Sequence, residues 1–115
     1  MIKPEELQQI MAQCYGTEKW YRLFPSCKFL YTDGVKTFAE KAEAYWLITE
    51  VFALVSGLPD DLYEIKLKVK DMKGVITIQT GKKVVRREEI PFTDCPEGEW
   101  VFFYCDNVFL WHDEY

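Results

Sequence analysis

With 115 residues, the chain is long enough for one ordinary domain and too short for two, so we treat residues 1–115 as a single domain. Hydrophobic residues make up 49% of the sequence and aromatic residues 17%, which excludes a disordered chain because so much apolar surface can be buried in a core. The formal net charge of −5 disfavours a protein that binds nucleic acid over most of its surface, since an acidic surface repels phosphates.

The first predicted element is a short amphipathic helix that begins at Pro4 and is closed by Gly16. Proline and the two glutamates after it suit the first turn of a helix, and apolar residues then recur at helical spacing. These apolar residues are Leu7, Ile10, Met11 and Cys14. No apolar signal sequence precedes the helix, so we expect a cytoplasmic protein that does not contact a membrane.

The segment 17–30 contains several large apolar residues but no regular period. The pair Pro25–Ser26 interrupts any single helix or strand pattern within it, because proline and serine are typical of turns. We therefore predict a helical turn followed by an extended piece of chain.

The strongest helical pattern runs from Val35 to Val55 and predicts one helix of about five turns. Thr32 or Asp33 can cap its start, and Gly57 follows its end. Apolar residues form a stripe along one side, and most charged residues lie off that stripe. The stripe consists of Val35, Phe38, Ala39, Ala42, Tyr45, Trp46, Thr49, Phe52 and Ala53. A helix with such a wide apolar side needs a flat partner, which a sheet supplies.

Four or five strands follow, joined by short turns. Apolar and charged residues alternate without exception over 63–70, which predicts a strand with one buried and one exposed face. Further strands are predicted over 75–79, 83–90, 100–105 and 108–112. Asp106–Asn107 joins the last two, and both side chains tolerate the positive φ angles of a tight hairpin. These last strands are apolar on both faces, so helices or a partner should cover both.

The order of the elements predicts the fold class. Helices come first and strands second, and the strands are joined by connections short enough for sequence neighbours to pair. We predict an α+β fold in which N-terminal helices pack on one face of a four- or five-stranded antiparallel meander sheet.

The sequence offers little for catalysis or metal binding. His112 is the only histidine, and the cysteines at positions 14, 27, 95 and 105 match no zinc or redox spacing, so we expect reduced thiols and no cofactor. An enzyme with a cleft near Asp33 and Asp94 is an alternative. Aspartate beside threonine at a helix start or turn, however, more commonly hydrogen-bonds the local backbone.

A basic window over residues 66–87 is the first candidate binding face. It holds eight basic residues against the single acid Asp71. The basic residues are Lys66, Lys68, Lys70, Lys73, Lys82, Lys83, Arg86 and Arg87. The first three share one face of a strand, which predicts a basic platform for a nucleic acid, a nucleotide or an acidic protein. The alternative is a solvated face whose lysines discourage edge-to-edge association.

Aromatic residues crowd the last two strands and form the second candidate interface. The residues concerned are Trp100, Phe102, Tyr104, Phe109 and Trp111. Strand alternation sends aromatic side chains to both faces of the sheet. Either the helices and the segment 17–30 cover both sets, or one set stays exposed and binds another protein or a second copy of the chain.

The stretch LYTDGVK at 30–36, with AEKA at 39–42 and AYWLI at 44–48, resembles a small family of uncharacterised proteins from bacteria, phages and other mobile elements. Phe92–Thr93–Asp94 and the final Asp113–Glu114–Tyr115 are similar to the same family. Because the family has no known activity, the resemblance implies no catalytic residues. It implies a setting in which small acidic proteins often inhibit components of host defence.

The sequence thus favours a non-enzymatic protein that acts by contact with a protein partner. Inhibition of a host defence complex is the role that the resemblance implies. Nucleic-acid or nucleotide binding through the basic window, and catalysis by an uncharacterised small enzyme, are the alternatives.

Overall fold

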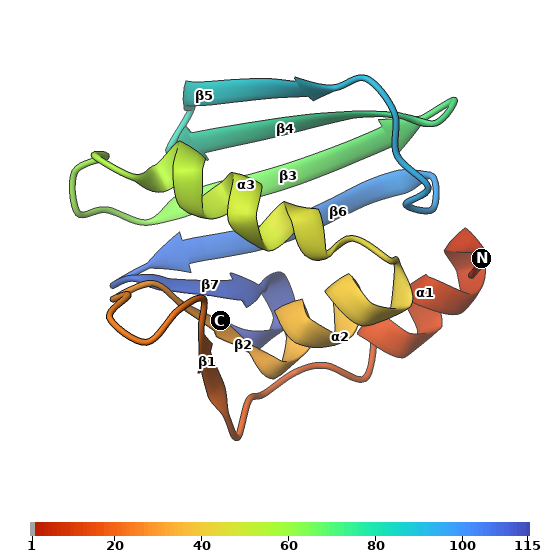
Figure 1. Cartoon of the computed structure of the whole chain (residues 1–115). Coiled ribbons are helices and arrows are strands. Elements are labelled where there is room, and N and C mark those ends of the chain that lie inside the picture. The colour runs from red at the N-terminus through yellow and green to blue at the C-terminus, as the bar shows by residue number, and fades with distance from the viewer. Residues whose placement is uncertain (1) are drawn as a thin grey trace.

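The structure is a computed structural model that describes residues 2–115. These residues form three α-helices and one seven-stranded sheet (Figure 1). In chain order the elements are α1 (Pro4–Met11), β1 (Trp20–Arg22), β2 (Leu30–Thr32), α2 (Asp33–Lys41), α3 (Tyr45–Val55), β3 (Tyr63–Lys70), β4 (Lys73–Thr80), β5 (Lys83–Ile90), β6 (Gly98–Cys105), β7 (Val108–Trp111) and the 3-10 turn η1 (His112–Glu114). None of the helices within residues 2–115 is long and apolar enough to cross a membrane.

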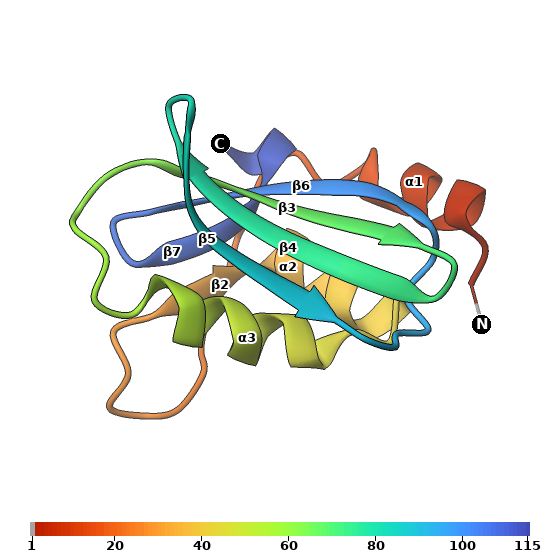
Figure 2. The ribbon, with the colours of Figure 1, turned by 90° about the horizontal axis from the view of Figure 1, so that it is seen from above.

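The helices α2 and α3 lie across one face of the sheet (Figure 2). We call this the helix face and the opposite one the outer face. The buried residues of β3 point to the helix face and alternate with charged residues on the outer face, as the sequence predicts. The α+β class is therefore confirmed, and the charged side chains of β3 lie on the outer face.

The predicted meander of four or five antiparallel strands is wrong in strand number and order. The sheet has the order β1-β2-β7-β6-β3-β4-β5, and β2 pairs with β7 in parallel. The chain leaves β5 at the edge of the sheet and returns to pair β6 with β3, on the side of β3 away from β4. The sheet is consequently mixed, and the first-half strands β1 and β2 lie at one edge of it, next to β7 from the end of the chain.

Composition explains why β6 rather than β5 lies in the middle. β5 carries charged residues on both of its faces and is exposed along nearly its whole length, which suits an edge strand. β6 is apolar on both faces and has buried or half-buried residues from Trp100 to Cys105. A strand of the second kind is stabilised by neighbours on both sides.

Two helices replace the single helix predicted over 35–55. α2 ends at Lys41 and α3 begins at Tyr45, while Glu43 between them has a φ of 54°, which a right-handed helix does not accept. The break changes which side of the second half faces the sheet. The buried residues of α3 are Leu47, Ile48, Val51 and Val55. Tyr45 and Thr49, which a continuous helix would have turned inward, are exposed instead.

The segment 17–30 also differs from the prediction. In place of a helical turn, Trp20–Arg22 forms β1, which pairs antiparallel with β2. The extended piece is confirmed as the start of β2, and Leu30 donates its backbone N–H to the carbonyl of Asn107 at 2.8 Å. The pairing with β2 and β7 fixes this segment, and local sequence patterns do not reveal pairing partners far along the chain.

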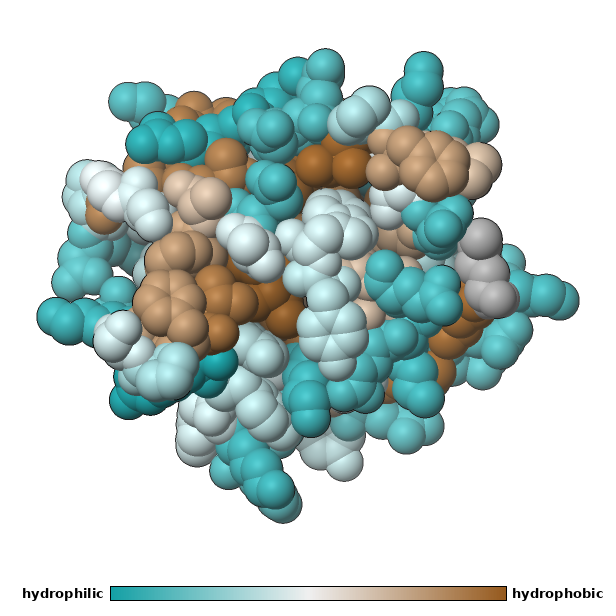
Figure 3. All heavy atoms as spheres, viewed as in Figure 1, coloured by the Kyte–Doolittle hydropathy of each residue, from teal (hydrophilic) through white to brown (hydrophobic). Residues whose placement is uncertain are grey.

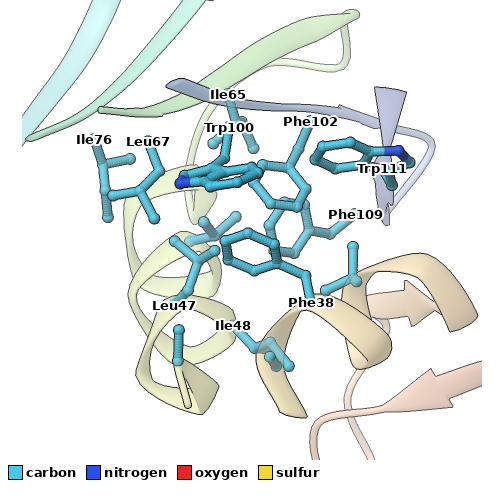
Figure 4. Close-up of a cluster of buried hydrophobic side chains, with 14 of the residues drawn as sticks. Phe38, Leu47, Ile48, Ile65, Leu67, Ile76, Trp100, Phe102, Phe109 and Trp111 are labelled. Carbon is cyan, nitrogen blue, oxygen red and sulfur yellow. The ribbon is translucent and has the colours of Figure 1, made fainter. Parts of the chain in front are cut away.

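The core lies between the helix face of the sheet and α2 and α3. Phe38 of α2 is fully buried against an aromatic set from β6 and β7 (Figure 4). Its ring centroid lies 5.2 Å from that of Phe102 and 5.5 Å from that of Trp100. Trp111 closes the set, with its ring centroid 5.3 Å from that of Phe102. Aromatic pairs at these distances stabilise the core beyond their buried area.

Candidate binding surfaces

The aromatic residues predicted as an interface lie mostly in the core. Trp100, Phe102, Phe109 and Trp111 are buried, and only Tyr104 is half-buried. The Trp100 indole N–H donates to the carbonyl of Pro96 at 3.0 Å. The structure therefore uses these side chains to hold α2 and α3 on the sheet, and they offer little surface to a partner.

Cover on the outer face of the last two strands comes from the end of the chain. Leu110 points to that face and is only 7% exposed. Tyr115 lies over Phe103, with 5.2 Å between ring centroids. The C-terminal turn η1 and Tyr115 thus provide the second cover that the sequence requires for strands that are apolar on both faces.

The eight basic residues do not form one surface. Lys66, Lys68 and Lys70 do share the outer face of β3, and Lys73 lies opposite Lys70 in β4. Lys82 and Lys83 lie at the β4–β5 turn, at the other end of the sheet from the β3–β4 turn (Figure 2). Arg86 pairs with Ile78 on the helix face, and Arg87 pairs with Thr77 on the outer face.

Acidic side chains from neighbouring strands interrupt the basic part of the outer face. Lys66 Nζ lies 3.6 Å from a carboxylate oxygen of Glu64 and 3.4 Å from one of Glu99. Glu99 is the main cause of the raised pKa of Lys66. Arg87 contacts Glu89 at 3.0 Å on the same face. The outer face is therefore a mixed-charge surface, on which Lys68 and Lys70 are the exposed lysines of β3 without a salt bridge among the described residues.

Two carboxylates organise the start of α2, and one of them is Asp33. Its Oδ2 accepts the backbone N–H groups of Glu18 and Lys19 at 3.0 and 3.2 Å, and its Oδ1 accepts the Tyr21 hydroxyl at 2.8 Å. These hydrogen bonds, with that from Glu18 first, lower the pKa of Asp33. The carboxylate is fully engaged in tying β1 to α2.

The second carboxylate is Glu114, near the end of the chain. It accepts the Thr32 hydroxyl at 2.6 Å, the Gly34 N–H at 3.0 Å and the Trp111 N–H at 2.9 Å. We call this arrangement the C-terminal clasp. The clasp joins residues 30–36 to residues 113–115, two of the stretches that carry the family resemblance. Both stretches thereby have a structural role at the positively polarised start of α2.

The geometry does not join Asp33 to Asp94, the second acid considered for catalysis. Asp33 bonds to residues 17–21, whereas Asp94 lines a hollow with Met72, the N-terminal Ile2 and Pro4, and its neighbours in the β5–β6 connection. In the described part of the chain, no three His, Cys, Asp or Glu residues are grouped to hold a metal ion. The four cysteines form no disulfide; Cys27 and Cys95 are buried, and Cys14 and Cys105 are half-buried.

A surface that the sequence analysis missed lies on the helix face beside β1 and β2. We call it the tyrosine surface and define it as Tyr21, Tyr31, Lys36, Glu40 and Tyr45. The Tyr21 and Tyr31 rings stack with 5.4 Å between centroids, and Lys36 Nζ lies 4.7 Å from the centre of the Tyr21 ring. Lys36 also pairs with Glu40 at 3.6 Å.

Tyr45 extends this surface from the first turn of α3. Its side chain is 51% exposed, and its pKa is raised by partial burial and then by the neighbouring Glu40 carboxylate. Figure 3, which faces the helices, shows pale and brown side chains gathered over α3 and over the region of β1 and β2 below it. Tyr31 immediately precedes the Thr32–Asp33 cap, whereas Tyr21 lies well before it in the sequence, so the pairing of β1 with β2 was needed to bring the two tyrosines together.

The fold and these surfaces define a class: an α+β protein with a mixed seven-stranded sheet and with helices α2 and α3 on one face of it. The chain belongs to the family described as "Family of unknown function (DUF6876)", whose model matches residues 5–115. No curated protein and no solved structure matches the chain. The predicted family resemblance is thereby confirmed.

Proposed function

We propose that the protein is a non-enzymatic binding protein that acts by occupying a surface of another protein, and that the tyrosine surface makes the contact. The observation that carries this proposal is the presence of three solvent-accessible tyrosines on a rigid frame. Tyrosine joins a large apolar ring to a polar hydroxyl and has few rotatable bonds, so it gives much contact area for little loss of side-chain entropy.

The geometry supports preorganisation of this surface. Tyr21 is held by its hydrogen bond to Asp33 and by its stack on Tyr31, and Asp33 is itself held by two backbone N–H groups. A partner therefore meets rings that are already in place. Binding to a preorganised surface avoids part of the entropy cost that weakens contacts made by flexible side chains.

Nucleic-acid or nucleotide binding by the basic window is the alternative that the same structure supports less well. Phosphate binding needs several unpaired cations in one place. Lys66 is paired with Glu64 and Glu99, and Lys82 and Lys83 lie at the opposite end of the sheet from Lys70. The mixed charge of the outer face favours its role as a solvated face.

The family setting suggests the kind of partner. Since the resemblance implies phages and other mobile elements, we propose a component of a host defence complex as the protein that the tyrosine surface contacts. The chain would then act as an inhibitor by blocking the surface that this component uses. The support for this step is the family resemblance and not the geometry.

Capture from a lysate of the source cells, with the purified chain immobilised, tests the proposal. Tyr31→Ser and Tyr45→Ser should each lose a protein that the unchanged chain retains. Lys68→Ser and Lys70→Ser are the matched controls, because they remove exposed side chains from the outer face, and they should retain it. Equal thermal midpoints for all four variants are required, so that lost capture reports lost contact.

Retention by the tyrosine variants together with loss by the lysine variants would transfer the binding site to the outer face. Specific capture of nucleic acid by the unchanged chain, weakened by added salt, would contradict the proposal in favour of the basic window.

A further inference from the structure

A hollow of about 350 Å³ lies at the end of the sheet where the β3–β4 turn meets the β5–β6 connection. We call it the hairpin-end hollow. It is lined by Ile2, Pro4, Met72, Thr93, Asp94, Cys95, Pro96 and Glu97, and most of its lining is apolar. A hollow of this size and character can hold one large apolar side chain.

The turn beside the hollow has an unusual residue in a strained position. Asp71 and Met72 have φ angles of 54° and 62°, as a two-residue hairpin of the left-handed kind requires. Glycine or asparagine normally takes the second position, and Asn107 does so in the β6–β7 hairpin, with a φ of 66°. A methionine at this positive φ strains the backbone, whereas glycine would not. The contacts of the Met72 side chain are therefore of interest.

Local contacts hold Met72 at the rim of the hollow. The Met72 carbonyl accepts the Thr93 N–H at 2.9 Å, and the Asp71 N–H donates to Glu97 at 2.8 Å. The Met72 side chain is nevertheless 47% exposed, so the chain itself does not use its apolar surface fully. The turn therefore presents a flexible apolar side chain at the mouth of a hollow whose wall is fixed by hydrogen bonds.

A matching apolar group lies next to the hollow in the same chain. Phe92 is 63% exposed and immediately precedes Thr93, which lines the hollow. A projecting phenylalanine and a hollow on one patch are self-complementary, because a two-fold axis through the patch brings each phenylalanine to the hollow of the other copy. Figure 3 shows brown atoms projecting at the upper right, where the β5–β6 connection lies in Figure 1.

The charges around the patch are compatible with a second copy. Lys70, Asp71 and Lys73 come from the β3–β4 side, and Asp94 and Glu97 come from the β5–β6 side, where Glu97 accepts the Asp71 N–H. Because the patch carries both signs, a rotation by 180° allows Lys70 and Lys73 of one copy to lie opposite Asp94 of the other. A patch of a single sign would instead repel its own copy.

We propose that two copies of this chain associate through the hairpin-end hollow, each inserting Phe92 into the hollow of the other beside Met72. This interface is separate from the tyrosine surface, so a dimer could still bind a partner there. It also replaces the predicted homodimer through the aromatic strands β6 and β7, whose side chains are mostly buried.

Sedimentation velocity over about 1 to 100 µM chain, a range in which small interfaces dissociate, measures the association. The unchanged chain should form dimers, and Phe92→Ser should stay monomeric with an unchanged thermal midpoint. Tyr15→Ser is the matched control, because it removes an aromatic side chain that is 77% exposed beyond the other end of α1, and it should dimerise as the unchanged chain does.

Met72→Gly separates association from folding. Glycine accepts the φ of 62° without strain, so the thermal midpoint should rise or stay, while the dimer dissociation constant should increase about tenfold or more. An unchanged chain that is monomeric over the whole range overturns the proposal and leaves the hollow to a different occupant. Dimerisation of Phe92→Ser equal to that of the unchanged chain also overturns it.

Discussion

Substitution of Gly34 by alanine should break the C-terminal clasp. An added Cβ would clash with the Glu114 carboxylate and lie 2.9 Å from Trp111 Cβ, a distance that real Cβ atoms do not show. The carboxylate can swing away, but Trp111 Cβ is fixed by the core and cannot. The clash with the carboxylate is relieved only when Glu114 leaves, which removes its bonds to Thr32, Gly34 and Trp111, while the close contact with Trp111 Cβ remains.

The size of the effect follows from these three hydrogen bonds. Each bond to a charged acceptor is worth about 1.5–3 kcal/mol when water is excluded, and water replaces part of this value because Glu114 is half-buried. We expect Gly34→Ala to lower the free energy of unfolding by about 2–4 kcal/mol. Urea unfolding followed by circular dichroism at neutral pH measures the change.

Two further variants make this test specific. Gly16→Ala is the matched control. No atom lies within 4 Å of the position that the new methyl group would take, and the φ of Gly16 is not positive. This substitution should change the free energy of unfolding by less than about 1 kcal/mol. In a Glu114→Ala background, Gly34→Ala should cost at least about 1 kcal/mol less than in the unchanged chain. A change below about 0.5 kcal/mol for Gly34→Ala, or full additivity with Glu114→Ala, would refute the clasp.

Three other outcomes follow from the core and from the titrating groups. Phe38→Ala should lower the free energy of unfolding by about 3–5 kcal/mol, and a loss under about 1 kcal/mol would show that Phe38 is not central to the core. Hydrogen bonds lower the folded pKa of Asp33, so the stability that its carboxylate contributes is present above the ordinary pKa of aspartate and is lost as pH falls through the folded pKa. The difference in thermal midpoint between the unchanged chain and Asp33→Asn should therefore shrink from about pH 6 to pH 3. A difference that stays constant over this range would contradict the argument. Burial raises the pKa of Cys95 to about 12, so iodoacetamide at about pH 8 should label Cys105 before Cys95 in the folded chain, with the difference abolished in urea.

Local periodicity was sufficient to predict part of the fold. The alternation over 63–70 fixed both the bounds of β3 and the face on which its lysines lie. The bounds of β5 and the left-handed Asp106–Asn107 turn were also predicted. In each case the determining interactions lie within one strand or one turn, where side-chain chemistry and backbone geometry are directly linked.

Long-range pairing accounts for what could not be predicted. Ala42, Glu43 and Ala44 are acceptable in a helix, so nothing local marks the break; it becomes favourable because Leu47 and Ile48 then face the sheet. The acids that neutralise Lys66 are similarly hidden, since Glu99 reaches it only because β6 pairs with β3.

The same reason applies to the candidate sites. The predicted aromatic interface was a core because the helices cover one face of β6 and β7 and the chain end covers the other. The tyrosine surface was missed because Tyr21 and Tyr31 are brought together by strand pairing and Tyr45 is exposed by the helix break. Surface composition is thus decided by tertiary contacts that a local pattern does not contain.

Titration calorimetry with the purified captured partner, at about 0.1 M and 0.5 M NaCl, tests the proposed function most directly. The account predicts that Tyr45→Ser raises the dissociation constant about tenfold or more at both salt concentrations, whereas Lys68→Ser changes it less than about threefold. The unchanged chain should bind with almost equal affinity at the two salt concentrations. A steep loss of affinity in 0.5 M salt, with Lys68→Ser as the damaging variant and Tyr45→Ser without effect, would contradict the central claim.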